Sequence, residues 1–464
     1  MNSNKKIHLE ISERKILLRI LDVFIVLTFL NLFSLFFEFD YFSFHSHNYT
    51  WAIVLALYIN IFGSVFEMYN LQVASNQFQI LKSVILTTST TVLIYLLTPI
   101  FAPKLPSNRL QILFFYFAIL FALFAWRILY ANFLASHRFS KKVILICDID
   151  QVEELVVGLE KIDLHYKIVG YINTDSIQEK DYCFNYVKNI EIENLNNFVK
   201  TNGISEIVIA SQKTDGITVK LYNQLIYLLE NGLVIREYTQ VYESLTYRIP
   251  VQYIERDFYR FFPFSRNNQN KLYLGFVKIT EVIISIFGLF LASVFIPFIL
   301  SINFFANKGS LFYRQDRVGR NGKIFKILKF RTMVQNAENG TPIFAKTNDS
   351  RITPFGKFLR KSRIDEFPQF LNILKGDMSV IGPRPERPVF VKEIALKMPF
   401  YETRHVIKPG LTGWAQVNYS YGESIDDSLI KLQYDLYYIK HRSLFLDINI
   451  IFKTISTVLF YRGQ

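Results

Sequence analysis

Cysteine is scarce in this sequence, which has only Cys147 and Cys183 among 464 residues. Two cysteines cannot build the disulfide framework of a small secreted protein, and neither of them has metal-ligand spacing. The scarcity indicates a reducing compartment.

A glycine-rich turn is also missing where a dinucleotide-binding domain would need one. The first β-branched run ends in Cys147-Asp148-Ile149-Asp150, which offers no close backbone approach to a pyrophosphate. We therefore expect a structural or regulatory module there. The spacing of Asp148 and Asp150 leaves a metal-binding pair as an alternative. No tyrosine has a lysine four residues later, which excludes nucleotide-sugar dehydratases and epimerases that need such a pair.

Acidic residues are outnumbered, with 39 Asp and Glu against 52 Lys and Arg and a formal charge of +13. This excess fits a polyanionic ligand or the anionic lipid of a cytoplasmic leaflet. Hydrophobic residues make up 51% of the chain, and 45 are Phe, above the level usual in soluble proteins. The composition predicts a membrane protein, and the length predicts two or three structural units.

Four apolar runs in the first third of the chain are each about the 20 residues that a membrane-crossing helix needs. They are Ile16–Phe37, Trp51–Met68, Ile80–Phe101 and Leu110–Leu134. Basic residues precede the first run (Lys5, Lys6, Arg14 and Lys15) or lie at its start (Arg19), and others follow the fourth (Arg138, Lys141 and Lys142). Both ends of this four-helix transmembrane bundle should therefore face the cytoplasm.

Strand and helix patterns alternate in the next hundred residues. The predicted strands are Val143–Cys147, Lys167–Ile172, Glu206–Ala210 and Val234–Tyr238. This alternation predicts a parallel sheet in a Rossmann-like α/β domain.

A fifth apolar run, Leu272–Phe305, contains Pro297 and is longer than one crossing needs. A proline inside a helix removes a hydrogen bond and kinks it. A full crossing and a hairpin that enters and leaves on one face both fit. Lysine and arginine flank the run on both sides, which favours a re-entrant hairpin with both ends in the cytoplasm.

Basic residues are concentrated after this run, with 14 Lys and Arg against three acidic residues between Lys308 and Arg363. A lipid-facing surface and a phosphate site are both compatible with this charge. Residues 325–333 alternate basic and apolar side chains, which predicts a strand with Lys329 and Arg331 on one face.

Asp365 and Glu366 form an adjacent carboxylate pair before a short apolar run that Gly376 ends. Pro368 suits a first helical turn, so we predict a helix over Phe367–Lys375 with Asp365 near its N-cap. The helix N-terminus would keep Asp365 ionised and would attract phosphate. Neighbouring helical residues point about 100° apart, so the two carboxylates should have different tasks. An ordinary N-cap followed by a first-turn acid is the alternative.

Gly382-Pro383-Arg384-Pro385 predicts a rigid turn in which two prolines restrict the backbone around Arg384. An arginine held in this way suits a phosphate or a planar base. A second turn-rich block follows at Lys408-Pro409-Gly410-Leu411-Thr412-Gly413-Trp414.

With these motifs in place, the last 190 or so residues resemble the bacterial sugar transferase family, which comprises membrane-bound phosphoglycosyl transferases. The matching motifs are Phe312-Tyr313-Arg314-Gln315-Asp316-Arg317-Val318-Gly319, Lys329-Phe330-Arg331-Thr332-Met333, Asp365-Glu366-Phe367-Pro368-Gln369, the Pro383-Arg384-Pro385 turn and Lys408–Trp414. The whole layout is similar to the large monotopic branch. The ending, Asp435-Leu436-Tyr437-Tyr438-Ile439-Lys440, is similar to glucose-1-phosphate transferases that start exopolysaccharide or capsule repeat units.

The resemblance implies that Asp365 attacks the sugar-bearing phosphate of a UDP-sugar, that UMP leaves, and that undecaprenyl phosphate then takes the phosphosugar. Asp365 and Glu366 would work with Mg²⁺. The resemblance assigns neutralisation of phosphate oxygens to Lys329, Arg331 and Arg360, and nucleotide contacts to Pro383, Arg384 and Pro385. Glucose is the expected sugar, and galactose is the next alternative.

The expected architecture is a membrane protein of α and α/β class in the bacterial inner membrane, with its catalytic domain on the cytoplasmic face. The expected parts are the transmembrane bundle (1–137), the Rossmann-like domain (138–240), a linker (241–270), the re-entrant hairpin (271–306) and a small α/β catalytic domain (307–464). Membrane lipids are expected partners, nucleic acid is not, and a homodimer is an open alternative.

One departure from the family concerns the hairpin. Its Ser-Pro break is replaced here by Ser293-Val294, with Pro297 three residues on. A non-catalytic membrane scaffold for polysaccharide assembly is the rival function, and the intact Asp365-Glu366 pair argues against it.

Overall fold

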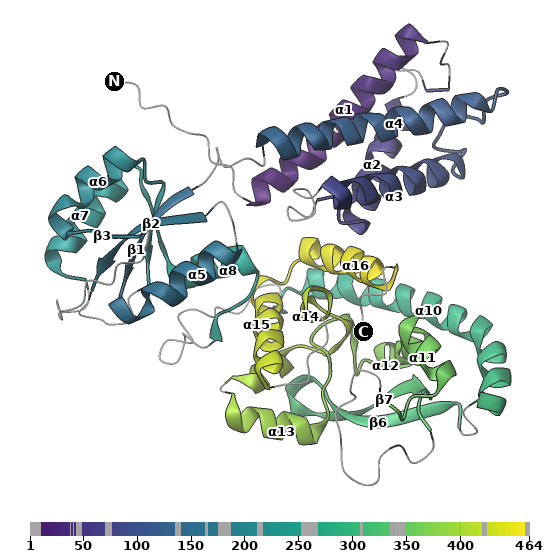
Figure 1. Cartoon of the computed structure of the whole chain (residues 1–464). Helices are drawn as coiled ribbons and strands as arrows, with labels where there is room; N and C mark the ends of the chain where they lie inside the picture. Colours follow the sequence, from purple (N-terminus) through teal and green to yellow (C-terminus); the bar gives the residue numbers. More distant parts are fainter. Residues whose placement is uncertain are drawn as a thin grey trace. The chain divides into compact units, whose positions relative to one another are not determined.

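A computed structural model describes most of the chain, which forms two compact units, Met1–Thr246 and Tyr247–Gln464 (Figure 1). We call them the N-terminal and C-terminal units. The described residues are 11–37, 39, 41–42, 49–69, 77–134, 141–162, 166–174, 187–210, 217–251, 268–306, 310–334, 337, 349–398, 400–419 and 425–459. Cys183 lies outside them.

Apolar helices form the first part of the N-terminal unit. They are α1 (Ile11–Phe36), α2 (Tyr49–Val65), α3 (Gln77–Leu96) and α4 (Leu110–Leu129), and α4 continues into a π-helical turn at Tyr130–Leu134. The stretches Glu13–Phe36 and Leu110–Asn132 are long and apolar enough to cross a membrane, whereas the apolar parts of α2 and α3 are shorter. Each predicted span is therefore a helix, and two of them have full crossing length.

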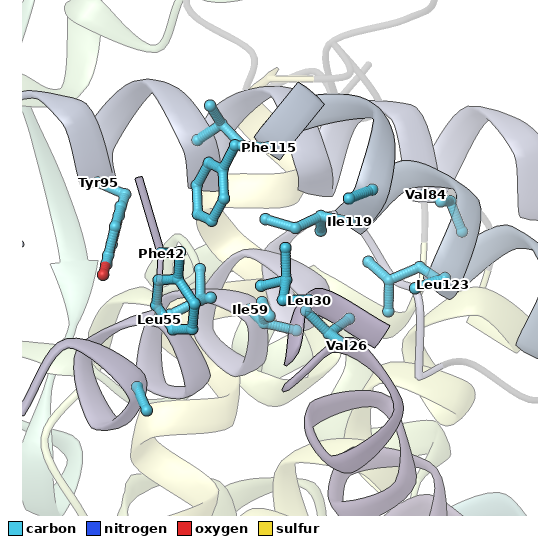
Figure 2. Packing of buried hydrophobic residues seen from close by; sticks show 14 of the residues in the cluster. Val26, Leu30, Phe42, Leu55, Ile59, Val84, Tyr95, Phe115, Ile119 and Leu123 are labelled. Atoms are coloured by element: carbon cyan, nitrogen blue, oxygen red, sulfur yellow. The ribbon is translucent and has the colours of Figure 1, made fainter. Parts of the chain in front are cut away.

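Aliphatic and aromatic side chains fill the space between these helices (Figure 2). Leu30, Leu55, Ile59, Phe115 and Ile119 are all fully buried there. Close packing of this kind holds the helices together in a bundle.

A buried ion pair joins α1 to α4 inside the bundle. Arg127 Nη2 lies 2.5 Å from Asp22 Oδ2, and both side chains are inaccessible to solvent. The guanidinium groups of Arg127 and Arg19 lie over the ring of Tyr69, at 5.4 and 4.9 Å from its centre. Burial among apolar helices makes each charge depend on the other.

The second part of the N-terminal unit is a parallel five-stranded sheet of order β3-β2-β1-β4-β5. The strands are β1 (Lys141–Cys147), β2 (Tyr166–Asn173), β3 (Lys188–Asn189), β4 (Glu206–Ile209) and β5 (Val234–Glu237). The accompanying helices are α5 (Val152–Ile162), α6 (Leu195–Asn202), α7 (Val219–Glu230) and α8 (Tyr238–Thr246). The predicted Rossmann-like sheet is confirmed, except that β3, only two residues long, has no periodic signal in the sequence.

In the C-terminal unit, α10 (Lys271–Ala306) is a single helix of 36 residues that includes Pro297. It contacts the rest of the unit along most of its length. These contacts are Tyr273 with Asp447, Glu281 with Ser379, Gly288 with Phe370, Phe295 with Phe367, and Ile299 with Leu359. They extend over about 39 Å at 1.5 Å per residue.

A helix that left the unit at a right angle would contact it only at one end. α10 therefore lies along the unit, while its other side exposes large apolar residues such as Ile283, Phe287 and Phe290. This arrangement is compatible with a helix that enters and leaves on one face, and the re-entrant topology, with a break at Ser293 or Pro297, stays a prediction.

The remaining elements form a small α/β unit. The strands pair as β6 (Phe312–Val318) with β7 (Ile324–Phe330), antiparallel, and as β8 (Ser379–Ile381) with β9 (Gly410–Thr412), parallel. The helices are α11 (Pro354–Lys361), α12 (Phe370–Lys375), α13 (Pro388–Lys397), α14 (Trp414–Asn418), α15 (Ile425–His441) and α16 (Leu444–Leu459). Short 3₁₀ helices are η8 (Arg320–Gly322), η9 (Ile364–Gln369) and η10 (Tyr401–Val406).

The segment predicted as a linker contributes to both units. Residues 241–246 are the end of α8, and Ile249 and Val251 are buried in the core around Leu432 and Leu436. The chain therefore begins packing into the C-terminal unit well before α10.

Removal of one charge from the Asp22–Arg127 pair is expected to destabilise the bundle. Asp22→Ala leaves a buried guanidinium without its counterion, which costs roughly 3–5 kcal/mol. The double variant Asp22→Leu/Arg127→Leu removes both charges and should regain most of this loss. Thermal unfolding of the detergent-solubilised protein measures both effects. A single variant as stable as the wild type would contradict this role.

Candidate active site

The adjacent carboxylates Asp365 and Glu366 lie in η9, between Arg363 and α12, and are 6% and 8% exposed. Arg363 has a left-handed backbone (φ 57°), which turns the chain sharply out of α11 into η9. The predicted α-helix over Phe367–Lys375 is wrong in its first three residues, which belong to η9, and is confirmed over Phe370–Lys375. Its predicted end is confirmed, because Gly376 follows α12 with φ 89°.

Glu366 is bound by basic groups that come from separate parts of the chain. Its Oε1 lies 3.0 Å from Lys329 Nζ, 3.1 Å from Arg384 Nη2 and 3.8 Å from Arg363 Nη1. Burial alone would raise the pKa of Glu366, but these positive charges outweigh it and hold the pKa below its ordinary value. Glu366 is therefore a permanent anion at neutral pH.

Asp365 has a different environment although it is the next residue. Its Oδ1 is buried and accepts no hydrogen bond from the described residues. Burial and the Glu366 charge raise the pKa of Asp365 to about 6, against the opposing charges of Lys329, Arg360 and Arg363. A helix N-terminus is not what keeps this carboxylate ionised, because Asp365 lies within η9 and the N-cap of α12 is Gln369. Asp365 is still largely ionised at pH 7, with an oxygen free to react.

The predicted phosphate-binding residues divide into two groups. Lys329 contacts Glu366, and Arg360, whose Nε donates to Thr332 Oγ1 at 2.9 Å, lies close enough to influence Asp365. Arg331 follows the last residue of β7 and directs its guanidinium to the carbonyl and hydroxyl oxygens of Ser310, at 2.9 and 2.7 Å. Strand β7 ends at Phe330, so the alternation that grouped Lys329 with Arg331 stops one residue before Arg331.

The sequence analysis assigned no role to Arg363, although its side chain contacts Glu366. The sequence shows that Arg363 lies two residues before Asp365. Its contact with Glu366 is explained by the left-handed backbone of Arg363, which the sequence does not show.

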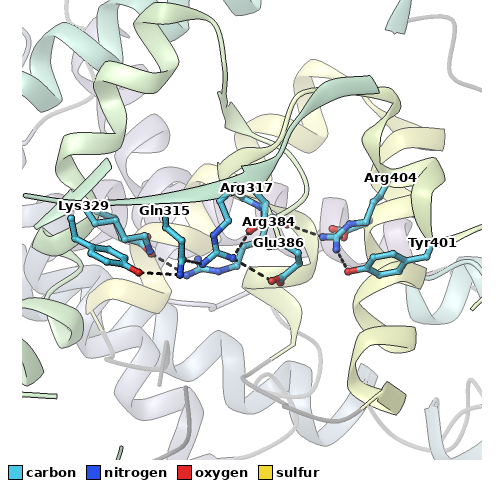
Figure 3. A network of polar contacts seen from close by, with 11 residues as sticks. Gln315, Arg317, Lys329, Arg384, Glu386, Tyr401 and Arg404 are labelled. Carbon is cyan, nitrogen blue, oxygen red and sulfur yellow. Dashed lines mark hydrogen bonds and ion pairs between the residues drawn. The ribbon is translucent and has the colours of Figure 1, made fainter. Parts of the chain in front are cut away.

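The Gly382-Pro383-Arg384-Pro385 turn brings Arg384 to the carboxylates, and it is fixed by close backbone packing. A Cβ on Gly410 would lie 2.1 Å from the nitrogen of Gly382, and one on Gly413 would lie 2.1 Å from the oxygen of Gly382. Only glycine fits at positions 410 and 413, because the backbone of Gly382 lies against both. The two turn-rich blocks of the sequence, Gly382–Pro385 and Lys408–Trp414, therefore pack together in the fold. Figure 3 shows Arg384 within the surrounding polar network.

A pocket of about 340 Å³ opens beside Glu366. Its charged lining residues include Arg363, Glu366, Arg384, Arg404 and Asp435, and its apolar lining residues include Ile284, Phe367, Phe370, Ile451, Ile455 and Val458. Ile455 and Val458 are partly exposed, so the apolar lining reaches the surface. The pocket can therefore hold a molecule that carries both phosphate and hydrocarbon.

The donor set can be tested against a hard divalent cation. Among the described residues, no group of three His, Cys, Asp or Glu side chains lies together. Mg²⁺ needs fewer protein ligands, because it binds through one or two carboxylates plus water and phosphate oxygens. The unpartnered Asp365 Oδ1 beside Glu366 fits that requirement. At the alternative pair, Asp148 instead accepts a hydrogen bond from Thr174, and no third ligand is near in the described part of the chain.

Comparison with family models gives two matches. A model described as bacterial sugar transferase matches residues 273–461, which contain α10, the carboxylates and the pocket. A model described as CoA-binding domain matches residues 64–225, which include the parallel sheet up to β4.

Individual relatives each match part of the chain. UDP-N-acetylgalactosamine-undecaprenyl-phosphate N-acetylgalactosaminephosphotransferase of Aeromonas hydrophila is 52% identical over 151 residues, which are 32% of this chain and 36% of that protein. UDP-glucose:undecaprenyl-phosphate glucose-1-phosphate transferase of Xanthomonas campestris pv. campestris is 46% identical over 157 residues, 33% of this chain and 32% of that protein. The match therefore spans about a third of each of these relatives.

A shorter relative is covered almost completely. Exopolysaccharide production protein ExoY of Sinorhizobium fredii is 36% identical over 199 residues, which are 40% of this chain and 85% of that protein. The matched part of this chain thus corresponds to nearly the whole of that relative.

Asp365→Asn is expected to stabilise the folded protein at pH 7.5. The carboxyl titrates near 6 in place of its ordinary 3.8. Ionisation of Asp365 therefore lowers the free energy of unfolding by about 3 kcal/mol above pH 6. It has no effect below pH 3.8, where the carboxyl is protonated in both the folded and the unfolded protein. The gain from the variant should shrink as the pH is lowered from 7.5 to 4.5, which unfolding measurements in detergent can follow.

Glu366→Gln is the matched control and should act in the opposite direction. Its carboxylate is held by Lys329, Arg384 and Arg363, so the variant should lose stability at pH 7.5. Equal effects of the two substitutions would refute the assigned difference between the carboxylates.

Proposed function

The chain belongs to the bacterial sugar transferase family, and from this premise we propose that it transfers a sugar 1-phosphate from a UDP-sugar to undecaprenyl phosphate. The observation that carries the proposal is the difference between the two carboxylates in η9. Glu366 contacts Lys329 and Arg384, whereas Asp365 keeps an oxygen that accepts no hydrogen bond from the described residues. The product would be the first lipid-linked intermediate of a repeat unit for an exopolysaccharide, capsule or O-antigen.

Asp365 is the nucleophile of the first step. A carboxylate oxygen attacks the phosphorus that bears the sugar, the bond from that phosphorus to the bridging oxygen breaks, and UMP leaves with the bond electrons. In the second step, a phosphate oxygen of undecaprenyl phosphate attacks the same phosphorus and releases the Asp365 carboxylate. Covalent capture divides one difficult displacement into two easier ones.

Phosphoryl transfer depends mainly on positioning and on positive charge near the phosphate oxygens. Lys329, Arg363 and Arg384 are drawn to one place by Glu366, which neutralises part of their charge and keeps them in position. Arg360 is close enough to Asp365 to act on the same phosphate. Asp365 and Glu366 would hold Mg²⁺, which would neutralise phosphate charge.

The charged and the apolar lining residues of the pocket suit the two ends of the acceptor. Phosphate suits Arg363 and Arg384, and the first isoprene units suit Ile284, Ile451 and Ile455. The apolar side of α10 supports insertion from one membrane face, with the C-terminal unit at the cytoplasmic surface.

The sugar is the least constrained part of the proposal. The Xanthomonas relative is named for glucose, the expected sugar, and the Aeromonas relative is named for N-acetylgalactosamine. Release of UMP across a panel of nucleotide sugars distinguishes them.

Asp365→Asn should abolish UMP release and the radiolabelled enzyme formed from a UDP-sugar carrying ³²P in its sugar-bearing phosphate. An amide is a far poorer nucleophile, so a loss of at least about 10³-fold is expected. Glu386→Gln, which alters a carboxylate that lines the same pocket outside η9, is the comparison and should still form the labelled enzyme. Full activity of the Asp365 variant would defeat the proposal.

Ile455→Trp should slow only the second step. The larger side chain would fill part of the pocket and lower transfer to undecaprenyl phosphate by roughly tenfold, the effect of losing about 1.4 kcal/mol of binding. UMP release in the absence of acceptor should stay within about twofold. Ile448→Trp is the matched control, because Ile448 is equally exposed on α16 and does not line the pocket. Equal slowing by both variants would remove the pocket from the acceptor route.

A further inference from the structure

Two carbonyl groups of the Gly-Pro-Arg-Pro turn, those of Arg384 and Pro385, each accept a hydrogen bond from an arginine side chain. Arg404 Nη2 donates to the carbonyl oxygen of Arg384 at 3.0 Å, and Arg317 Nη1 donates to that of Pro385 at 3.0 Å (Figure 3). These arginines come from η10 and β6, far from the turn in sequence. The backbone of the turn is therefore fixed from two sides by charged donors.

Arg404 is itself held tightly. It is 5% exposed, its Nη1 lies 2.6 Å from the hydroxyl oxygen of Tyr401, and its Nη2 lies 2.7 Å from Asp435 Oδ2 on α15. Burial would lower the pKa of Arg404, but Tyr401 and Asp435 outweigh it and raise the pKa. The guanidinium is thus charged and fixed in orientation before any ligand arrives.

These contacts form a continuous series from α15 to the reactive carboxylates. Asp435 orients Arg404, Arg404 binds the Arg384 carbonyl, and the Arg384 guanidinium contacts Glu366 at 3.1 Å. The Arg384 side chain is 31% exposed, so packing alone does not fix it. The orientation of its backbone decides whether it reaches Glu366.

We infer that Arg404 and Asp435 are positioning residues for the transfer reaction: they set the backbone of Arg384 so that its guanidinium stays on Glu366. This inference rests on the proposed function for its kinetic consequence. It gives Asp435, which begins the Asp435–Lys440 run noted in the sequence, a role in the site without contact to the reacting atoms.

A double-mutant cycle tests the coupling in the full-length protein. Arg404→Lys keeps the charge, but a single ammonium group lacks the forked geometry that reaches Tyr401, Asp435 and the carbonyl together. We expect it to lower kcat for UMP release about tenfold, as loss of a charged hydrogen bond does. In an Arg384→Ala background the same substitution should change kcat less than about twofold, because the group that it positions is gone.

Arg442→Lys is the matched control. Arg442 is also buried in the C-terminal unit, but its guanidinium lies over the rings of Tyr273 and Tyr438. It should lower the unfolding temperature and leave the Arg384 coupling unchanged. Equal losses from Arg404→Lys in both Arg384 backgrounds would overturn the inference, because direct substrate contact or a general folding defect acts independently of Arg384.

Hydrogen exchange without substrate provides a readout that needs no activity. The amide of Gly382, the first residue of the turn, donates to the carbonyl of Thr412, and the amides of Gly410 and Val318 donate to the carbonyls of Pro383 and Glu386. Arg404→Lys and Asp435→Asn should each speed exchange in peptides containing these amides by about tenfold, and Arg442→Lys should not. Unchanged exchange in the first two variants would refute the positioning role. If the wild type released UMP from no donor while exchange changed as expected, the proposed function alone would fail.

Discussion

The site depends on burying two adjacent carboxylates that must not behave alike. Side by side in a low-dielectric place, two anions raise each other's pKa, and one of them would take up a proton. Here Lys329, Arg384 and Arg363 all contact the same oxygen of Glu366, so Glu366 stays charged and Asp365 bears the cost of burial. This difference provides a fixed anion that organises cations and a second carboxylate with a free oxygen.

The rest of the C-terminal unit maintains this arrangement. Lys329 comes from β7, Arg384 from a turn locked between glycines, and Arg404 from η10, so three distant parts of the chain must fold before Glu366 has its partners. The long apolar helix α10 takes part in the same framework, since Glu281 contacts Ser379 at the start of β8, which leads into the turn. The apolar helix and the site are therefore parts of one folded structure.

Sequence patterns predicted the elements whose signal is local. Apolar runs predicted the long apolar helices, and the alternation of strand and helix patterns predicted the parallel sheet. The positions of Pro368 and Gly376 located the segment that contains the carboxylates. The pattern could not distinguish a 3₁₀ helix from an α-helix in η9, because that choice depends on the left-handed Arg363 and on burial. Nor could it separate Lys329 from Arg331 or connect Asp435 with Arg404, because such pairs form only when residues far apart in sequence meet.

The central claim is that Asp365 carries the sugar phosphate between donor and acceptor. In the most direct test, the wild-type protein is mixed with Mg²⁺ and a UDP-sugar that it accepts as donor, without the lipid acceptor. The reaction is quenched with acid, and the digested peptides are sequenced by mass spectrometry. The account predicts a sugar phosphate on Asp365 that disappears when undecaprenyl phosphate is added before the quench. Steady turnover to the lipid product with no adduct on Asp365, or with the adduct on another residue, would contradict it.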